Sequence, residues 1–391
     1  MKQKIYLDHA ATTPVRPEVV EAMLPYYREE YANPAAVYGF STEARKAIDW
    51  SRMVIAKQIG ALKEEIYFTG GGTESDNWAI VGIARAYRNR GRHIITSAIE
   101  HPAVRHTMQW LETEGFEVTY LPVDNEGMVS LERLQSAIRP DTILLSIMAA
   151  NNEIGTIEPL EQIGALAKAK GVLFHTDAVQ AFGQIPLDVE KMQIDLLSAS
   201  AHKLGGPKGV GMLYVRKGVA IQPLMHGGGQ ERGLRPGTLN TPGIVGFGKA
   251  VELAAMGQEE RIEKEIFLRD YLTKRIETEI PYAGLMGSRE NRLPGHACFG
   301  IRFCEGEALV LLLDREGIYV SSGSACTMGS RESSHVLQAL GLSEEQSKEG
   351  IRFTLSERNT KEEIDKTVHA LKEAVKTLRA MTPQAMFGRE E

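Results

Sequence analysis

Between about residues 60 and 260, short apolar segments alternate with segments whose apolar residues recur every three to four positions. The short segments predict strands at 65–69, 93–97, 117–123, 142–148, 172–176, 195–200 and 211–215. The periodic segments predict helices, most clearly at 74–89, 103–115 and 159–171. This alternation is typical of an α/β fold around a mostly parallel or mixed sheet, in which ligands bind at the carboxyl ends of the strands.

The pattern changes after Thr241, where one or two long helices are predicted up to Pro281. Further strands are predicted at 295–303, 317–321 and 350–355, and helices at 306–316 and 360–381. Thr360 and Glu363 are spaced as a capping box for the last helix. Because 391 residues exceed what one core usually serves, we expect two domains and a tail. The expected large domain is 15–260, the smaller α+β domain is 1–14 with 261–381, and 382–391 form a mobile tail.

Composition excludes several classes of protein. The net charge is −6 and no segment supplies a basic stripe, so we expect no direct binding to nucleic acid. No apolar run approaches a membrane span and the first residues contain no signal-like segment, so we expect a cytoplasmic protein. The three cysteines and ten histidines lack the spacings of a disulfide framework or a metal site.

Asp177 and Lys203 each follow a predicted strand. In a pyridoxal-phosphate site, a lysine amine forms a Schiff base with the cofactor and a carboxylate keeps the pyridine nitrogen protonated. Considered alone, the pair is explained more simply as a helix N-cap and a surface lysine. The two residues therefore suggest such a site only in combination with other features.

Three such features follow from the sequence. The segment TGGGTESDN (69–77) stands directly before a predicted helix, where backbone N–H groups suit a phosphate, although a tight turn explains it equally well. Arg352 lies in a predicted apolar strand, where it suits either a ligand carboxylate or an intrachain salt bridge. His101 ends a strand, where it is either a turn residue or a ring that stacks on a flat cofactor.

Cys326 lies in the segment SSGSACTMGS (321–330), whose small and polar residues predict an accessible loop. By contrast, Cys298 and Cys304 lie in or beside a strand pattern and are predicted to be packing residues. The pattern therefore favours Cys326 as a nucleophile that moves with its loop, with an incidental turn cysteine as the alternative.

Nine segments together resemble the cysteine desulfurases of the NifS/IscS type, within the class V aminotransferase fold. In order they are YLDHAATTPVRPEV, NPAAVYGFSTEAR, TGGGTESDN, IEHPAV, ANNEIGTIEPL, HTDAVQAFGQIPLDV, SASAHKLGGPKGVGMLYVR, GGGQERGLRPGT and SSGSACTMGS. The resemblance extends from the N-terminus to about residue 360, and the SSGSAC form is similar to the subgroup with the long cysteine loop. It implies a fold type I pyridoxal-phosphate transferase and a homodimer.

The resemblance also implies a cofactor role for each matching residue. Lys203 would hold pyridoxal 5′-phosphate covalently, and Asp177 would pair with its ring nitrogen. Gln180 would bond the phenolic oxygen, and His101 would stack on the ring and move protons. The phosphate would be bound by Thr73, Ser200, His202 and, from a second subunit, Thr238.

For the substrate, the resemblance implies that Asn152 and Arg352 hold the carboxylate of L-cysteine. Cys326 would take the sulfur as a persulfide, leaving L-alanine, and pass it to an acceptor protein for iron–sulfur cluster assembly or tRNA thiolation. The alternatives are another pyridoxal-phosphate enzyme, such as a class V aminotransferase, or a catalytically silent scaffold. The chain departs from the resembled pattern at positions without a chemical role above, which are Tyr38, Gly70, Leu239, Met328 and Ser333.

Overall fold

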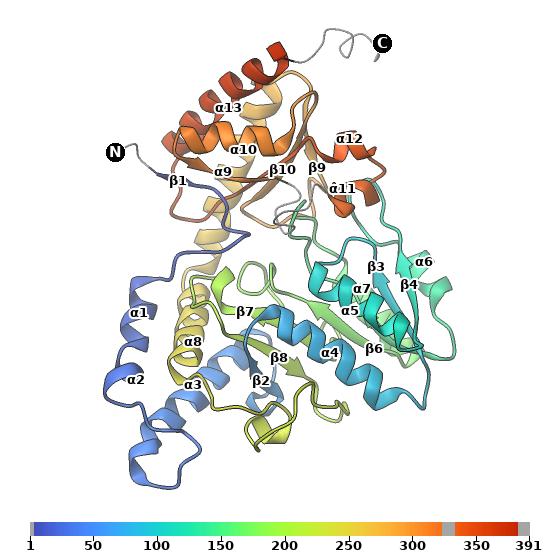
Figure 1. Ribbon diagram of the computed structural model, residues 1–391, viewed down its shortest axis with the longest axis vertical. Coiled ribbons are helices and arrows are strands. Elements are labelled where there is room, and N and C mark those ends of the chain that lie inside the picture. The colour runs from blue at the N-terminus through green and yellow to red at the C-terminus, as the bar shows by residue number, and fades with distance from the viewer. Residues whose placement is uncertain (1–3, 323–332, 382–391) are drawn as a thin grey trace.

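The computed structural model describes residues 4–322 and 333–381. Its strands form a seven-stranded sheet, a four-stranded sheet and a two-stranded ribbon. Figure 1 shows the larger sheet in the lower part of the molecule and the smaller one above it. The predicted α/β class, with a mostly parallel sheet and a smaller α+β part, is confirmed.

The large sheet contains every strand predicted between residues 60 and 260. In spatial order its strands are β2 (Ile66–Thr69), β8 (Gly211–Val215), β7 (Leu196–Ser200), β6 (Leu173–Asp177), β5 (Thr142–Ser146), β3 (His93–Ser97) and β4 (Glu117–Leu121). Strand β8 is antiparallel to both of its neighbours, and the other pairs are parallel. The carboxyl ends of β3, β6 and β7 therefore lie along one edge, where the segments carrying the predicted cofactor residues begin.

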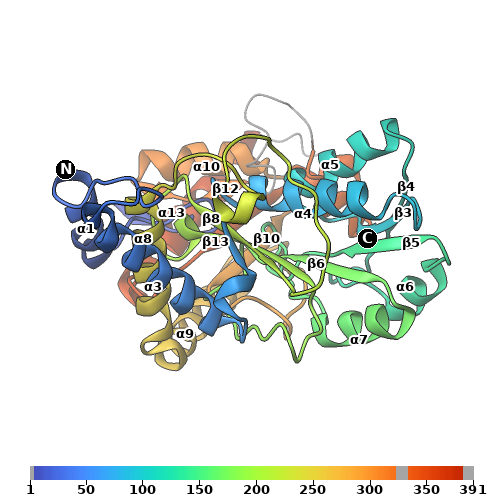
Figure 2. The ribbon, with the colours of Figure 1, turned by 90° about the horizontal axis from the view of Figure 1, so that it is seen from below.

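Helices cover both faces of this sheet. Those that follow the strands or pack beside them are α3 (Thr42–Gln58), α4 (Gly72–Tyr87), α5 (Pro102–Thr113), α6 (Leu131–Ala137), α7 (Leu160–Lys170) and α8 (Thr241–Ala255). Figure 2 shows α4 and α5 on one face and α6 and α7 on the other. Helix α4 buries Trp78, Ile80 and Ile83 beside the sheet, and each such side chain contributes about 1.5–3 kcal/mol. The two short helices α1 (Pro17–Met23) and α2 (Pro25–Arg28) lie beside α8.

The upper part of the molecule has a hydrophobic core of its own. Its antiparallel sheet consists of β12 (Ser321–Ser322), β13 (Gly350–Thr354), β10 (His296–Ile301) and β9 (Ala283–Met286), and β1 (Ile5–Tyr6) pairs with β11 (Ile318–Tyr319) beside it. Its helices are α9 (Gln258–Glu279), α10 (Gly306–Arg315), α11 (His335–Ala339), α12 (Glu344–Ser347) and α13 (Lys361–Met381). The capping box predicted for α13 is confirmed, because the N–H of Glu363 donates to Thr360 Oγ1 and the N–H of Thr360 donates to Glu363 Oε2.

The long helical segment after Thr241 is two helices rather than one. Helix α8 ends at Ala255, and α9 begins at Gln258. Gly257 between them has φ +64°, a left-handed conformation that interrupts helical hydrogen bonding and that glycine adopts without strain. The domain boundaries at 14/15 and 260/261 stay a prediction, and the predicted tail at 382–391 lies outside the described residues. No helix in the described ranges is long and apolar enough to cross a membrane.

Glu158 is a buried carboxyl group that lies after β5, away from the residues predicted to bind ligands. Its side chain is 3% exposed, and its Oε2 accepts a hydrogen bond from the N–H of Val129 at 3.0 Å. Its Oε1 has no hydrogen-bond partner in residues 4–322 and 333–381. Burial raises the pKa of Glu158 to about 8, so the folded protein favours the protonated carboxyl.

Replacing Glu158 with glutamine is expected to stabilise the protein at high pH. The folded pKa of about 8 exceeds the value of about 4.3 in an unfolded chain, so the stability that Glu158 contributes at acidic pH is lost as the pH rises to 8. Glutamine still accepts from Val129 but cannot ionise. At pH 9 the variant should gain roughly 2–4 kcal/mol in free energy of unfolding, and near pH 4 almost nothing. Urea denaturation at both pH values measures this, with the exposed Glu373→Gln as control, and an equal effect at both pH values would contradict it.

Candidate active site

A cavity of about 230 Å³ lies at the carboxyl edge of the large sheet. It is enclosed by the ends of β6 and β7, the first turn of α4 and the segment before α5. Eight of the predicted site residues line it: Thr73, His101, Asn152, Asp177, Gln180, Ser200, His202 and Lys203. The structure therefore brings together residues that lie up to 130 positions apart in the chain, as the resemblance implies.

Lys203 and Asp177 face this cavity from neighbouring strand ends. Asp177 is the last residue of β6, and Lys203 ends the short 3₁₀ helix that follows β7. The Lys203 amine donates to the backbone carbonyls of Ala10 and Ala11, the latter at 2.8 Å. Asp177 is buried and accepts from the N–H of Val179 at 2.9 Å. Burial raises the pKa of Asp177, and the nearby His101 and Lys203 oppose that effect, so a cationic partner would favour its carboxylate form.

His101 lines the cavity and also caps a helix. Its Nδ1 accepts from the N–H of Ala103 at 3.1 Å, which makes it the N-cap of α5. Burial lowers the pKa of His101, although the charge of Asp177 acts in the opposite direction. An uncharged imidazole with one nitrogen fixed by the helix is suited to stack on a flat ring and to exchange a proton.

The glycine-rich turn forms one end of the cavity. Gly71 and Gly72 lead into α4, so the first N–H groups of the helix face the space between Thr73, Ser200 and His202. A Cβ on Gly72 would lie 2.6 Å from Cγ2 of Val179, so any larger residue would displace Val179, which also lines the cavity. Burial, aided by nearby lysines, lowers the pKa of His202 to about 4, so its ring is neutral at pH 7 and suited to hydrogen bonding.

Arg352 and Asn152 meet at the side of the cavity toward the smaller sheet. Arg352 lies on β13 and is 2% exposed. Its Nη1 donates to the carbonyl oxygen of Asn152 at 2.6 Å, and its Nη2 donates to Oδ1 of Asp8 at 2.8 Å. Its Nε has no hydrogen-bond partner among the described residues. The structure thus contains an intrachain salt bridge, which was one of the two alternatives for Arg352 that the sequence allowed. The Nε–H of Arg352 beside this salt bridge is not used by any described residue.

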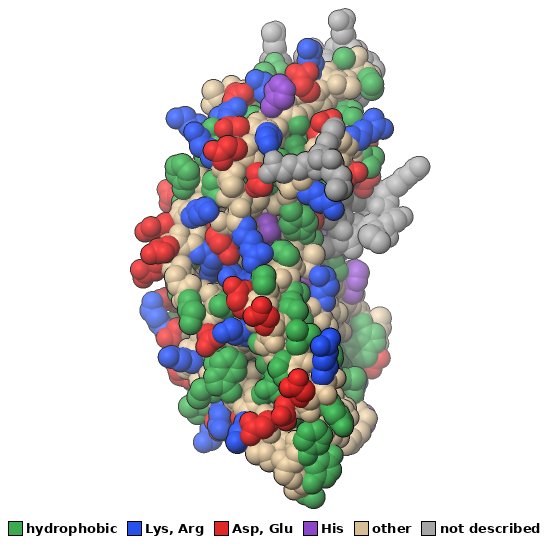
Figure 3. Space-filling view, turned by 90° about the vertical axis from the view of Figure 1, so that its left-hand side faces the viewer, with side chains coloured by type: hydrophobic (Ala, Val, Ile, Leu, Met, Phe, Trp, Pro, Cys, Tyr) green, Lys and Arg blue, Asp and Glu red, His purple; other side chains and the backbone are tan. Residues whose placement is uncertain are grey.

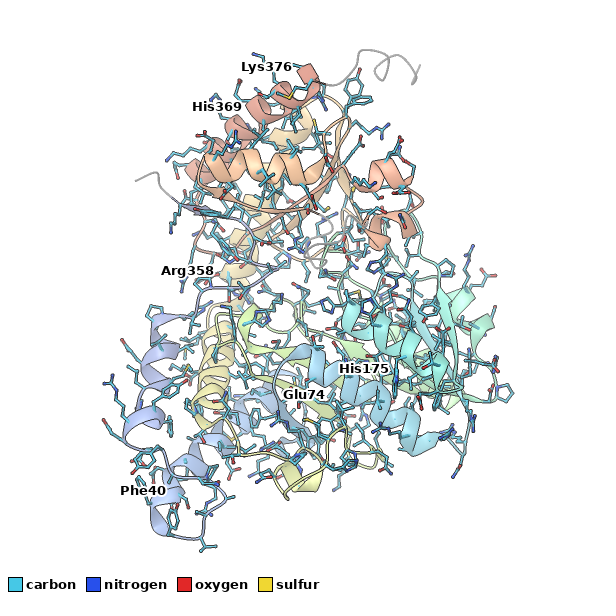
Figure 4. The ribbon with its side chains drawn as sticks, viewed as in Figure 1. Phe40, Glu74, His175, Arg358, His369 and Lys376 are labelled. Atoms are coloured by element: carbon cyan, nitrogen blue, oxygen red, sulfur yellow. The ribbon has the colours of Figure 1, made fainter. Side chains whose placement is uncertain are left out.

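Thr238 does not line the cavity. It is exposed on the segment that follows the short 3₁₀ helix Glu231–Gly233. That segment is anchored by a buried bidentate pair, in which the Arg52 guanidinium donates to both Glu231 carboxylate oxygens at 2.6 and 2.8 Å. It is anchored again where Arg235 pairs with Glu74 at 2.8 Å, on the first turn of α4 (Figure 4). Thr238 is therefore held on the surface and outside the cavity of its own chain. Cys326 lies outside the described residues.

Asp76 is an acid in the cavity wall that the sequence patterns did not indicate. It is 1% exposed, and its Oδ1 lies 3.7 Å from Nε2 of His175, on the central strand β6 (Figure 4). Within the described part of the chain this oxygen has no hydrogen-bond partner. Burial lowers the pKa of His175 to about 3, so this ring offers Asp76 no charge. Burial and the neighbouring Asp177 raise the pKa of Asp76 well above its usual value. Its position on the apolar face of α4, one turn before Ile80, was the available signal.

The arrangement fits pyridoxal phosphate. A primary amine and a buried carboxylate face one cavity, a neutral histidine stands beside them, and a glycine turn at a helix N-terminus provides an anion site at the end. The Gly72 position supports the fit, since the cavity wall there leaves no room for a side chain. Fold and site together define a pyridoxal-phosphate-dependent enzyme.

Comparison with known proteins gives the family. Residues 5–367 match the aminotransferase class-V family, and the chain belongs to it. A curated relative, the cysteine desulfurase IscS of Methanosarcina thermophila, is 54% identical over 379 residues, which cover 97% of this chain and 94% of the relative. Two similar solved structures are a NifS-like protein (TM-score 0.90, 42% identity, 96% of this chain and 100% of that one) and SspA in complex with cysteine (0.79, 40%, 92% and 100%). The chain is a pyridoxal-phosphate-dependent cysteine desulfurase.

Proposed function

We propose that this desulfurase acts on L-cysteine through Lys203, Asp177 and Cys326, and that sulfur leaves the substrate as a persulfide on Cys326. The observation that supports this proposal is the shared cavity, which Lys203, Asp177 and Asn152 line, while Arg352 lies outside the lining and donates to the carbonyl oxygen of Asn152. The solved complex of the similar protein SspA with cysteine supports the choice of substrate.

Each residue then has a defined task. When bound, pyridoxal phosphate supplies an electron sink that stabilises negative charge at the substrate Cα. Asp177 holds the ring-nitrogen proton in place, and Lys203 attaches the cofactor and then carries the Cα proton as base and acid. Arg352 and Asn152 hold the substrate carboxylate. The Cys326 thiolate attacks the substrate sulfur, so Cys326–SH and L-cysteine become Cys326–S–SH and L-alanine.

At the phosphate end, we propose that Thr73, Ser200 and His202 bind the phosphate and that Gln180 bonds the phenolic oxygen. Thr238 would complete this site from a second subunit, because it is exposed and outside its own cavity. Helix α2 and the segment after it carry a group of exposed apolar side chains, which is typical of a protein–protein interface. They are Tyr27, Tyr31, Val37, Tyr38 and Phe40. Figure 3 shows the side of the molecule on which α1 and α2 lie in Figure 1, with apolar side chains gathered at its lower end. A molar mass of one chain in solution, with full activity, would contradict the homodimer.

The persulfide sulfur requires a destination. We propose that it passes in the cytoplasm to an acceptor protein for iron–sulfur cluster assembly or tRNA thiolation. Transfer of this kind needs only an acceptor thiolate that attacks the outer sulfur of the persulfide. Incubating the persulfide-loaded enzyme with each class of purified acceptor and measuring labelled sulfur on the acceptor separates the two routes.

The first test of the proposed function uses purified enzyme with bound cofactor and labelled L-cysteine. Alanine and labelled protein persulfide should form in equal amounts in a single turnover. Formation of pyruvate or a new amino acid without persulfide would instead support the second candidate, an aminotransferase-type reaction on the same site. No product from any amino acid, in a protein that does not take up the cofactor, would support a silent scaffold.

A further inference from the structure

The segment from Asp8 to Thr13 crosses between the two parts of the molecule and contacts the active-site residues on both sides. The carbonyl oxygen of Ala10 accepts from Lys203 and, at 3.0 Å, from Nε2 of Gln180. The N–H of Ala10 donates to Oγ1 of Thr354, beside Arg352 on β13, at 2.8 Å. The segment is therefore fixed at Ala10, two residues after Asp8.

Asp8 forms an ion pair with Arg352 from this segment. Their side chains are 19% and 3% exposed, and Oδ1 of Asp8 lies 2.8 Å from Nη2 of Arg352. The carboxyl group of Glu153 also lies close enough to interact with the Arg352 charge. Burial raises the pKa of Glu153 to about 7, although the hydrogen bond from Ser334 and the charge of Arg352 oppose this rise. Glu153 is engaged elsewhere, because its Oε2 accepts from the Ser334 hydroxyl at 2.5 Å. Among the described residues, Asp8 is thus the carboxylate that pairs directly with Arg352.

The pairing leaves part of the guanidinium unused. Nη1 and Nη2 each carry two N–H groups. Asn152 accepts from one on Nη1 and Asp8 from one on Nη2, and no residue in the described ranges accepts from the buried Nε–H. An incoming carboxylate that grips the guanidinium through Nε and Nη2 would therefore meet Asp8 at one of its two contact points. Asp8 is also the more exposed partner. Its backbone is held by an isolated β-bridge to Thr354, so the Asp8 side chain is the part that can turn away from Arg352.

We propose that Asp8 is a stand-in for the substrate carboxylate: it neutralises Arg352 in the free enzyme, gives way when L-cysteine binds, and so lowers the affinity for the substrate. This rests on the proposed role of Arg352 in holding that carboxylate. A buried guanidinium without a counter-ion is costly, so an internal carboxylate stabilises the free state. Part of the substrate's binding free energy is then used to displace it.

The Asp8→Asn substitution tests the stand-in directly, because asparagine keeps the shape but removes the charge. The free enzyme should unfold at a lower temperature, and acetate, a simple carboxylate probe, should restore the lost stability. The KM for L-cysteine should fall about 10-fold while kcat changes less than about 3-fold, because a competitor for the carboxylate site has been removed. Asp365→Asn is the matched control: it breaks an aspartate–arginine pair with Arg275 on another face and should leave KM unchanged.

The opposite outcomes are equally informative. A higher KM in Asp8→Asn, with no response to acetate, would overturn the stand-in and show that Asp8 only holds Arg352 in position. If the variant does not fold, refolding in acetate should rescue it, and failure of that rescue would also overturn the proposal. The Arg352→Gln substitution distinguishes failure of the Asp8 proposal from failure of the proposed function. An unchanged KM in this variant would disprove the proposed role of Arg352 in binding the substrate carboxylate, whatever Asp8 does.

Discussion

Replacing Lys203 with alanine is expected to abolish both the covalent attachment of pyridoxal phosphate and the desulfurase reaction. Lys203 and Asp177 line the same cavity, and in the proposed mechanism the loss of the Lys203 amine removes the attachment point and the proton carrier together. The initial rate of alanine formation should fall at least about 10³-fold. The absorption band of the lysine-bound cofactor should disappear, which measures attachment independently of turnover.

Two controls separate chemistry from structure. Lys203→Arg keeps a cation near the carbonyls of Ala10 and Ala11 but cannot form the bond to the cofactor, so it should be as inactive as the alanine variant. Lys170→Ala, on the exposed end of α7, should behave as wild type. If Lys203→Ala kept a tenth of the activity, Lys203 would not be the reacting lysine.

Local pattern was enough to predict the elements of the large sheet. Neighbouring residues on these strands point to opposite faces, and both are buried, as with Leu144 and Leu145 in β5 and Ile94 and Ile95 in β3. Because both faces are covered, each strand is a short continuous run of apolar residues that is easily identified in the sequence. The break between α8 and α9 was left open, because a glycine inside a helical pattern does not reveal whether it adopts a left-handed conformation.

Only part of the candidate site could be predicted from the sequence. Residues that follow adjacent strands were predicted to lie together, whereas a contact between distant segments of the chain was not. Asp177 and Lys203 follow adjacent strands, and strand order alone brings them together. Asp8 lies 344 residues from Arg352, so its pairing depends on how the N-terminal segment crosses the molecule, which no local pattern encodes. Asp76 was missed for another reason, because an aspartate near the start of a helix normally suggests a favourable interaction with the helix dipole and not a buried acid.

Replacing Cys326 with alanine is expected to eliminate the enzyme-bound persulfide and to reduce alanine formation at least about 10³-fold. Only a thiolate attacks the substrate sulfur effectively, and the two cysteines in the described residues are unsuited to that task. Burial raises the pKa of Cys298 to about 12, and it also raises that of Cys304. Both side chains lie in hydrophobic clusters and are at most 2% exposed, so neither can reach a substrate or an acceptor protein.

These buried cysteines are the matched controls for the experiment. Cys298→Ala and Cys304→Ala should each keep one persulfide per chain after L-cysteine is added, with a loss of stability from the small cavity that each leaves. Labelled sulfur, alkylation of the persulfide and mass measurement locate the modified residue directly. Persulfide that survives in Cys326→Ala but disappears in Cys298→Ala would transfer the nucleophile role to β10. Because a thiol with a pKa of about 12 is almost wholly protonated at neutral pH, that outcome would require β10 to open during turnover.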